Sequence, residues 1–333
     1  MKFSLIICTY RRAKSLIRLL NSINSQTLYP NEILVIDGSK DDETLEILEQ
    51  NSFFNLSYFK VDDKDRGLTR QRNFGIQRVN KDSEIVCFLD DDTVLNSDYF
   101  EKIISTYRQN PEALGVGGYI IDNVNWYKVP INYVSKIEEY VYDGWARKDG
   151  SRFVLRKKLG LDSNVKPAHM PEFSHGRSVS FLPPSGKIYP VEQFMGGVSS
   201  FKKSIFESMK FSTYFEGYGL YEDADFTLRL SKKGELYVNT GACLLHLHDA
   251  DGRPNKFQYG KMVVRNGWYV WRVKYPNPRF IAVIKWNLLV FILSFLRLAN
   301  AITTKKRVES FTESMGRFYG WISLIFLKPK IEL

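Results

Sequence analysis

Short apolar runs alternate with segments of helical periodicity through the first 119 residues, and no other feature constrains the fold of this chain as strongly. Such alternation is typical of βαβ units, in which helices cover the faces of a mostly parallel sheet. The expected strands span residues 3–8, 32–37, 56–61, 84–89 and 114–119. The helices expected between them span residues 15–23, 41–49, 68–79 and 97–108. We therefore predict an α/β fold built around such a sheet.

The strand ends indicate where a ligand binds, because open α/β sheets hold ligands outside the carboxyl ends of their strands. Those ends fall at residues 9–12, 37–40, 62–66 and 90–92. Residues 121–194 are irregular and rich in Tyr, Trp, Pro and Lys, apart from a predicted helix near 134–145. Further helices are expected at 202–209 and 222–233, and further strands at 235–238 and 242–245. This pattern divides the chain into residues 1–120, 121–252 and 253–333.

The net charge of +10 is concentrated at one end of the chain. Residues 253–333 contain 15 Lys or Arg and three Glu, a charge of +12, which leaves −2 for the first 252 residues. A hydrophobic content of 44% argues against general disorder. The cysteines, Cys8, Cys87 and Cys243, are odd in number and widely spaced, so they indicate neither a disulfide framework nor a zinc site. The apolar run at the amino terminus is too short for the apolar region of a secretory signal, and a cytoplasmic location is expected.

Three adjacent carboxylates, Asp90, Asp91 and Asp92, directly follow an apolar strand. They would repel one another unless a cation bound there, and oxygen ligands favour Mg²⁺ or Mn²⁺. Asp92 and Asp90 are the first candidates for the metal, and Asp91 could meet a sugar or ribose hydroxyl. The alternative is a solvated acidic turn, but the triplet lies on the predicted ligand edge.

Six motifs occur in the order and spacing of a known family, and together they carry a resemblance that none carries alone. They are LIICTYRR, LVIDGSKDD, GLTRQRNFGI, FLDDDTVL, GGVSSFKKSIFE and YEDADFTLRLSKKG. The chain resembles glycosyltransferase family 2 over residues 2–271, with a poor match between 122 and 194. The resemblance implies the GT-A fold, with a Rossmann-like sheet, and metal-dependent, inverting sugar transfer from a nucleoside diphosphate sugar.

The resemblance also implies which residues bind the donor. Thr9, Tyr10 and Arg11 after the first strand and Asp37 after the second would hold the base and ribose. An aspartate there can accept a hydrogen bond from a base or ribose, and a tyrosine can stack on a base. For Asp37 the alternative is a turn or helix-capping aspartate. Arg72 would lie near the diphosphate, since a guanidinium suits two phosphate oxygens.

The second half of the resemblance implies the catalytic groups. Asp223 would take the proton from the acceptor hydroxyl and Glu222 would help to orient the acceptor. The alternative is an acidic first turn of a helix, stabilised by the helix dipole. Gly196 and Gly197 match the point where backbone approaches sugar and acceptor, although a simple turn would also select glycine.

Two histidines, His246 and His248, follow a short apolar strand at alternate positions, so both could reach one site. Relatives use a histidine near here as a further metal or diphosphate ligand, and His246 is the closer match. Its nitrogen would favour Mn²⁺ over Mg²⁺. The alternative is a pair of structural histidines.

The basic tail contains the most apolar stretch of the chain, residues 280–302. Its uncharged core, 286–296, is shorter than the roughly 20 residues that span a bilayer. A second apolar patch, 318–327, follows the basic cluster Lys305, Lys306 and Arg307. This pattern favours a helical extension lying on an anionic membrane surface. The alternative is a helix pair that packs on the catalytic domain or forms a homodimer interface.

We therefore expect an inverting glycosyltransferase that uses Mn²⁺ or Mg²⁺ and acts on a hydroxyl of a glycan or lipid-linked acceptor. It would serve cell-surface polysaccharide or glycolipid synthesis from the inner face of the cell membrane, as a peripheral protein. A sugar-phosphate nucleotidyltransferase is one alternative, but it would carry a glycine-rich arginine loop after the first strand, and CTYRRAKS contains no glycine. A nucleic-acid-binding protein is another, and it would leave the acidic motifs unexplained. No nucleic-acid partner is expected.

Overall fold

The computed structural model describes residues 1–122, 124–215, 217–247 and 254–331. The chain forms two compact units, each made of two separate segments. The first unit combines Met1–Asp122 with Pro184–Arg253, and the second combines Asn123–Pro183 with Pro254–Leu333. The second unit thus combines residues 123–183, called the insertion below, with residues 254–333, the tail. The three-part division expected from the sequence stays a prediction.

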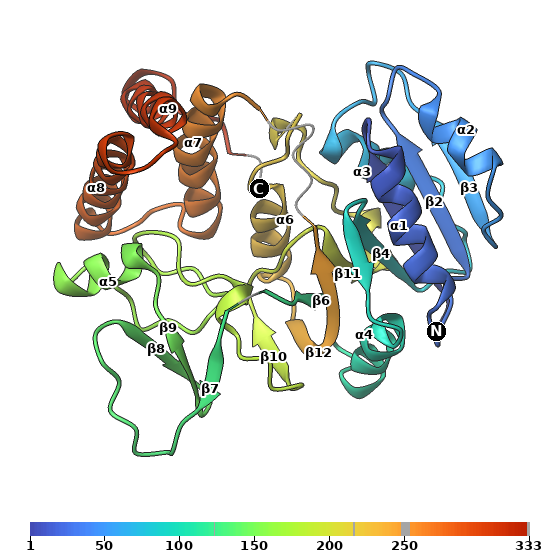
Figure 1. Cartoon of the computed structure of the whole chain (residues 1–333), viewed down its shortest axis with the longest axis horizontal. Coiled ribbons are helices and arrows are strands. Elements are labelled where there is room, and N and C mark those ends of the chain that lie inside the picture. The colour runs from blue at the N-terminus through green and yellow to red at the C-terminus, as the bar shows by residue number, and fades with distance from the viewer. Residues whose placement is uncertain (123, 216, 248–253, 332–333) are drawn as a thin grey trace. The chain divides into compact units, whose positions relative to one another are not determined.

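The first unit is built on a nine-stranded sheet of order β10-β12-β6-β11-β4-β1-β2-β3, with β5 paired to β12 (Figure 1). Its strands are β1 (Phe3–Thr9), β2 (Glu32–Asp37), β3 (Leu56–Lys60), β4 (Ile85–Asp90), β5 (Thr93–Leu95), β6 (Gly115–Ile120), β10 (Ile188–Val191), β11 (Val198–Lys202) and β12 (Leu236–His246). The strands β1, β2, β3, β4, β6 and β12 share one direction, because β11 pairs antiparallel with both β4 and β6. The prediction of a mostly parallel sheet is confirmed.

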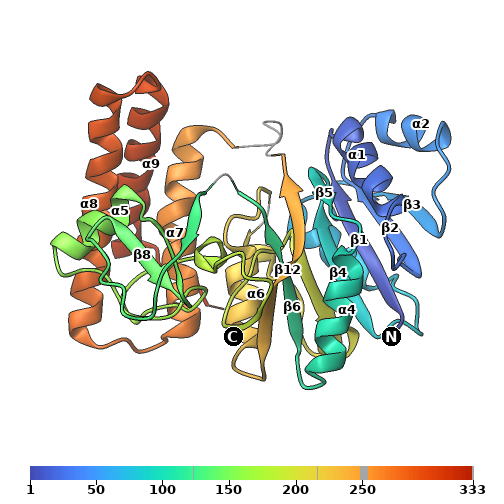
Figure 2. The ribbon, with the colours of Figure 1, turned by 60° about the horizontal axis from the view of Figure 1, so that its bottom comes forward.

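The helices of this unit follow the predicted alternation (Figure 2). They are α1 (Ala13–Asn24), α2 (Glu43–Glu49), α3 (Leu68–Ile76), α4 (Tyr99–Gln109) and α6 (Glu222–Leu230). The segment expected to form a helix at 202–209 is instead a 3₁₀ turn, η2 (Lys203–Glu207), and η3 (Thr213–Phe215) follows. The two strands expected at 235–238 and 242–245 are one strand, β12, with a register irregularity between Val238 and Cys243.

Both faces of the sheet are buried, which explains why its strands are continuous apolar runs. Alternate residues of a strand point to opposite faces. Leu5 and Ile7 of β1 belong to the core that includes α1 and α4, whereas Ile6 faces α3. A Cβ at Gly75 of α3 would lie 2.9 Å from Ile6 Cγ2, so the helix packs closely on that face. An aromatic cluster joins the sheet to α6, because Phe211 contacts both Phe88 of β4 and Phe226 of α6.

The insertion contributes a small antiparallel sheet to the second unit. Its strands are β7 (Trp126–Lys128), β8 (Glu139–Tyr142) and β9 (Trp145–Lys148), followed by α5 (Ser151–Lys158) and the 3₁₀ turn η1 (Val179–Phe181). The helix predicted near 134–145 is wrong. Asp143 and Gly144 have φ of 50° and 74°, which suits the tight turn of a hairpin, and an Asp-Gly pair is a strong hairpin signal.

Three long helices complete the second unit: α7 (Lys256–Lys274), α8 (Phe280–Thr303) and α9 (Arg307–Phe326). Helix α9 packs against both α7 and α8 (Figure 1). The crossing of α7 and α9 is very close: a Cβ at Gly316 would lie 2.0 Å from Phe257 O, and one at Gly260 would lie 2.1 Å from Glu313 O. Glycine is therefore required at both positions.

The insertion is tied to α7 by side chains that donate to its backbone. Trp271 Nε1 donates to Glu172 O at 2.7 Å, and the Tyr275 hydroxyl donates to Met170 O at 2.8 Å. Trp271 also stacks on Trp286 of α8, with ring centroids 5.4 Å apart. The insertion and the tail thus form one packed unit.

Helix α8 corrects the length argument made from the sequence. The uncharged core is short, but the helix has 24 residues, and its most apolar window has a mean hydropathy of 1.9. Among the described residues it is the one helix long and apolar enough to cross a membrane, by length and composition only, and 22% of that window is buried. Its charges have partners: Lys285 Nζ lies 4.9 Å from the Phe173 ring centroid, and Arg297 Nη2 lies 2.8 Å from Glu313 Oε2.

Candidate active site

The predicted site residues come together at one edge of the sheet in the first unit. Because β1, β2, β4 and β12 share one direction, their carboxyl ends meet at that edge. The antiparallel strand β11 begins there, so the Gly196–Gly197 turn that precedes it lies beside the end of β4, where Asp90 N donates to Gly197 O at 3.0 Å.

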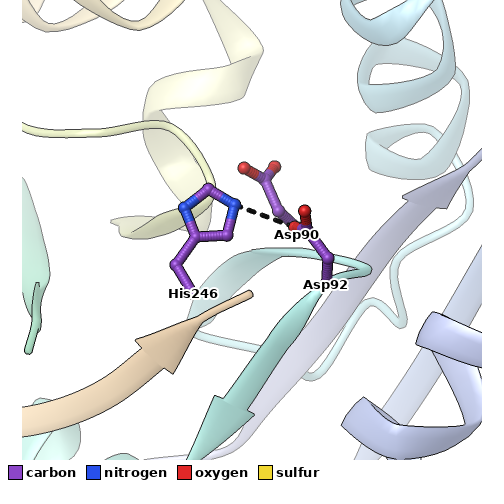
Figure 3. Close-up of side chains that lie close together, drawn as sticks. All are labelled: Asp90, Asp92 and His246. Carbon is purple, nitrogen blue, oxygen red and sulfur yellow. Dashed lines mark hydrogen bonds and ion pairs between the residues drawn. The ribbon is translucent and has the colours of Figure 1, made fainter. Parts of the chain in front are cut away.

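Asp90, Asp92 and His246 form a cluster whose ligating atoms all lie within 4.8 Å of one another (Figure 3). His246 Nε2 is 2.9 Å from Asp92 Oδ1. The cluster forms because β12 pairs with β5, which places His246 opposite Thr93, the residue after Asp92. Two carboxylates and an imidazole are a donor set that fits a divalent cation, and Mn²⁺ in particular.

The two carboxylates of the cluster act electrostatically on its histidine. Burial alone would lower the pKa of His246, yet its hydrogen bond to Asp92 and the charges of Asp92 and Asp90 raise that pKa. Asp92 is 3% exposed, whereas the side chain of Asp90 is 37% exposed and is the accessible carboxylate of the triplet.

Asp91 lies in the protein interior and is held by β1. Its Oδ2 accepts from Thr9 Oγ1 at 2.7 Å, and its Oδ1 accepts from Arg12 Nη1 at 3.1 Å. Burial raises the pKa of Asp91 to about 7, although both of these partners lower it. Arg12 Nη1 also lies 3.5 Å from Asp92 Oδ2. Thr9 and Asp91, predicted to bind the donor, therefore bind each other.

Sequence reasoning missed Arg12 and chose its neighbour Arg11. Arg11 has a φ of 55° and its exposed side chain lies over the Tyr10 ring, 5.4 Å from the centroid. The signal that favours Arg12 is its place directly before α1, where it reaches back to the acidic triplet. Tyr10 and Arg11 remain predicted donor contacts at the end of β1.

Asp37 is fully buried at the end of β2. Its Oδ1 accepts from Ser39 N at 2.7 Å and its Oδ2 accepts from the Tyr58 hydroxyl at 3.0 Å. The contact with Ser39 N is the one expected of a turn aspartate, whereas the contact with Tyr58 joins β2 to β3. Sequence reasoning also missed Gln71, whose Nε2 donates to Thr9 O at 3.1 Å and to Ile36 O at 2.7 Å, joining the ends of β1 and β2.

Arg72 of α3 is 2% exposed and pairs with two carboxylates. Its Nη1 donates to Glu222 Oε1, and its Nη2 lies 3.7 Å from Asp90 Oδ1. The next residue, Asn73, exchanges hydrogen bonds with the backbone of Phe211, at 2.9 Å to its carbonyl and 3.0 Å from its N–H. Arg72 was predicted to lie near the diphosphate, and its observed partners are protein groups.

Glu222 and Asp223 open α6 after Tyr221, whose φ of 70° is the left-handed conformation of a tight turn. Asp223 accepts from Gly196 N at 3.2 Å and from Ala224 N at 2.7 Å. Burial raises the pKa of Asp223, and burial raises that of Glu222 to about 8 in spite of Arg72. An aspartate fixed in this way has a raised basicity and a defined direction.

The two glycines before β11 have no room for a side chain. A Cβ at Gly196 would lie 2.4 Å from Glu222 Oε1, and a Cβ at Gly197 would lie 2.0 Å from Asp90 Oδ2. Glycine is needed here because the backbone packs on the carboxylates of the site. His248 lies outside the described residues.

Comparisons with known proteins point in one direction. The model of glycosyl transferase family 2 matches residues 4–171, which include the acidic triplet but end before Gly196, Glu222 and His246. A glucosyl-dolichyl phosphate glucuronosyltransferase of Haloferax volcanii is 28% identical over 123 residues, covering 36% of this chain and 39% of that protein. An O-antigen chain rhamnosyltransferase of Salmonella typhimurium is 31% identical over 118 residues, covering 35% and 37%. The chain thus spans less than two fifths of the length of these relatives.

Solved structures show the same fold at low identity. The crystal structure of Staphylococcus aureus TarS 1–349 superposes with a TM-score of 0.51 at 17% identity, covering 98% of this chain and 81% of that one. The structure of GalNAc-T7 with UDP, GalNAc and Mn²⁺ gives a TM-score of 0.53 at 15% identity, covering 100% and 59%. The expected GT-A fold is confirmed.

Proposed function

This chain belongs to glycosyltransferase family 2, and we propose that it is a glycosyltransferase that inverts the anomeric centre of a sugar taken from a nucleoside diphosphate sugar. The observation that carries the proposal is the Asp90, Asp92 and His246 cluster, which shares one sheet edge with the partly buried Asp223. The cluster suits a divalent cation, and Asp223 suits the role of proton acceptor. A displacement at a sugar carbon needs both, one for the leaving group and one for the attacking hydroxyl.

In this proposal Asp90, Asp92 and His246 hold Mn²⁺ or Mg²⁺. The ion would supply positive charge for the leaving diphosphate. Asp223 accepts the proton of the acceptor hydroxyl, and its raised pKa improves it as a base. Its hydrogen bonds from Gly196 N and Ala224 N hold one orientation toward the acceptor. Tyr10, Arg11 and Asp37, at the ends of β1 and β2, are the proposed contacts of the base and ribose.

The test is release of nucleoside diphosphate from a panel of nucleoside diphosphate sugars with Mn²⁺, with and without EDTA. We expect release that requires the metal, and its loss in Asp92→Asn and in Asp223→Asn. Asp98→Asn is the matched control, because Asp98 is a half-exposed carboxylate paired with Lys102. Release of pyrophosphate from a nucleoside triphosphate and a sugar 1-phosphate, in a parallel assay, would instead indicate a nucleotidyltransferase. A product with retained anomeric configuration in proton NMR would exclude inversion.

We also propose a glycan or lipid-linked acceptor, and with it a place in the synthesis of cell-surface polysaccharide or glycolipid. Two relatives carry names that refer to a dolichyl phosphate and to an O-antigen chain, which supports an acceptor of this kind. The acceptor panel for the assay should therefore include lipid-linked saccharides beside free ones.

A peripheral position on the inner face of the membrane is the proposed location. Helix α8 exposes an apolar stripe at a spacing of three and four residues, and each of its members is 43–57% exposed. The stripe consists of Ile281, Ile284, Leu288, Phe291 and Phe295. Helix α9 exposes a second stripe, Val308, Phe311, Tyr319, Ile322 and Phe326. Lys305 and Lys306 between the two helices, and Arg307 at the start of α9, suit anionic headgroups.

The packing of the second unit favours a helix pair lying in the interface over a crossing helix. Helix α9 packs along both α7 and α8, so a crossing α8 would take its neighbours into the bilayer with it. Helix α7 carries five Lys or Arg, and α9 carries two Arg and two Glu. Such charges are costly in the bilayer centre, whereas an interface accommodates them.

A further inference from the structure

We propose that Arg72 is a positioning residue, which acts through Glu222 and Asp90 and not by binding the donor diphosphate. This inference rests on the proposed function and concerns the same site. It gives Glu222 the same kind of role: Glu222 holds the first turn of α6 in place, so that the adjacent Asp223 is aimed correctly.

Arg72 forms a bridge, called the strut below, between Glu222 of α6 and Asp90 at the end of β4. Its guanidinium hydrogen-bonds Glu222, 150 residues away, and lies 3.7 Å from Asp90 Oδ1. Arg72 is 2% exposed and Glu222 is 4% exposed, so both side chains are buried. Within the described residues Glu222 Oε2 has no hydrogen-bond partner, and Arg72 is therefore what holds this carboxylate.

The aromatic surroundings of Arg72 fix its direction. The guanidinium carbon lies 5.6 Å from the Phe88 ring centroid and 5.2 Å from that of Phe211. Phe88 is on β4, two residues before Asp90, and Phe211 is held by Asn73, the neighbour of Arg72. A guanidinium packed against two rings and two carboxylates has little freedom to turn toward a ligand.

The Gly196–Gly197 turn closes over the same pair. Its backbone binds Asp223 through Gly196 N and β4 through Gly197 O, and a Cβ at Gly196 would lie 2.6 Å from Arg72 Nη1. The strut and the turn therefore connect the metal-side carboxylate with the proposed base. Their common function would be to set the separation between cation and base, which matters because a displacement of about 1 Å can cost about 100-fold in rate.

The test compares Arg72→Gln, Glu222→Gln and the double variant, with Arg70→Gln as the control on the same helix. Each single change leaves one buried charge without its partner, so Tm should fall, and the double variant should recover most of the loss. The affinity for a nucleoside diphosphate with Mn²⁺, measured by calorimetry, should stay within about threefold in the double variant while kcat falls about 100-fold.

Two results would overturn the inference. A large loss of nucleoside diphosphate affinity in Arg72→Gln, with kcat retained, would make Arg72 a donor ligand. Recovery of kcat together with Tm in the double variant would make the pair only a stabilising contact. If the wild-type chain released no nucleoside diphosphate, the proposed function would fail, and the Tm and calorimetric data would still report on the pair itself.

Discussion

Gly197 shows at the scale of one residue how closely the site is packed. The sequence left open whether this glycine serves a turn or a close approach, and the structure shows the backbone resting on Asp90. Because a Cβ would lie 2.0 Å from Asp90 Oδ2, Gly197→Ala must displace a proposed metal ligand. We expect Mn²⁺ affinity to fall at least about tenfold. Metal sites typically lose about 10- to 100-fold in affinity when the groups that orient a ligand are changed.

That prediction is checked by Mn²⁺ titration with calorimetry or electron paramagnetic resonance. Gly150→Ala is the matched control, because the nearest atom to its Cβ would be 3.8 Å away. Unchanged Mn²⁺ affinity in Gly197→Ala would mean that Asp90 does not bind the ion.

His175 gives the second unit a pH dependence. Burial and the charges of Arg152 and Arg156 lower the pKa of His175 from 6.5 to about 4. The unfolded chain therefore binds more protons between these values, and the free energy of unfolding decreases as the pH falls through this window. The loss is at most about 3 kcal/mol, since part of the residue is exposed.

Urea denaturation at pH 7 and at pH 4.5 measures this effect. The free energy of unfolding of His175→Gln should decrease less between pH 7 and pH 4.5 than that of the wild type. The other titrating groups contribute equally to both proteins. An equal loss of stability in both proteins would show that His175 does not carry it.

At the scale of elements, the crossing of α7 and α9 depends on their glycines. Gly316→Ala would place a Cβ 2.0 Å from Phe257 O, and backbone cannot yield as a flexible side chain would. We expect a loss of about 1–3 kcal/mol in the free energy of unfolding, the usual cost of overpacking. Glu309→Ala is the control on α9, because its ion pair with Lys256 is exposed and contributes little. A stability equal to that of the control would show that the helices can separate at no cost.

Elements also show what could be predicted from the sequence. The parallel strands and their carboxyl ends were predictable, because apolar runs with helical spacers leave few other arrangements. The placing of Asp90, Asp92 and His246 at one edge follows from that pattern. The partners of Arg72 and Asn73 were not predictable, because Phe211 and Glu222 lie more than 130 residues away and no local pattern connects them. The hairpin at Asp143 was missed although its signal is local.

At the scale of the whole molecule, charge is divided between the two units. The second unit contains 24 Lys or Arg and nine Asp or Glu, a formal charge of +15, which leaves −5 for the first. The basic character thus includes the insertion as well as the tail. A cationic unit that also exposes apolar stripes suits an anionic membrane.

The membrane prediction is tested by sedimentation with vesicles of phosphatidylcholine, with and without phosphatidylglycerol. We expect binding that requires the anionic lipid and weakens with salt, and that is reduced in Phe291→Ser with Ile322→Ser. Phe54→Ser, at a 74% exposed position of the first unit, is the control. If the stripes instead meet a second copy, light scattering would show a dimer that the double change dissociates, with no vesicle binding.

The interleaving of the two units limits how this chain can be divided or recombined. A cut near residue 253 removes α7, which the backbone of the insertion contacts at Glu172 and Met170, and so leaves half of a folded unit behind. Exchange of this unit between related proteins would need the insertion and the helices to move together, through crossovers at three places, near residues 122, 183 and 253. The insertion and the helices should therefore be inherited together, and a change in the packing surface of one should require a matching change in the other.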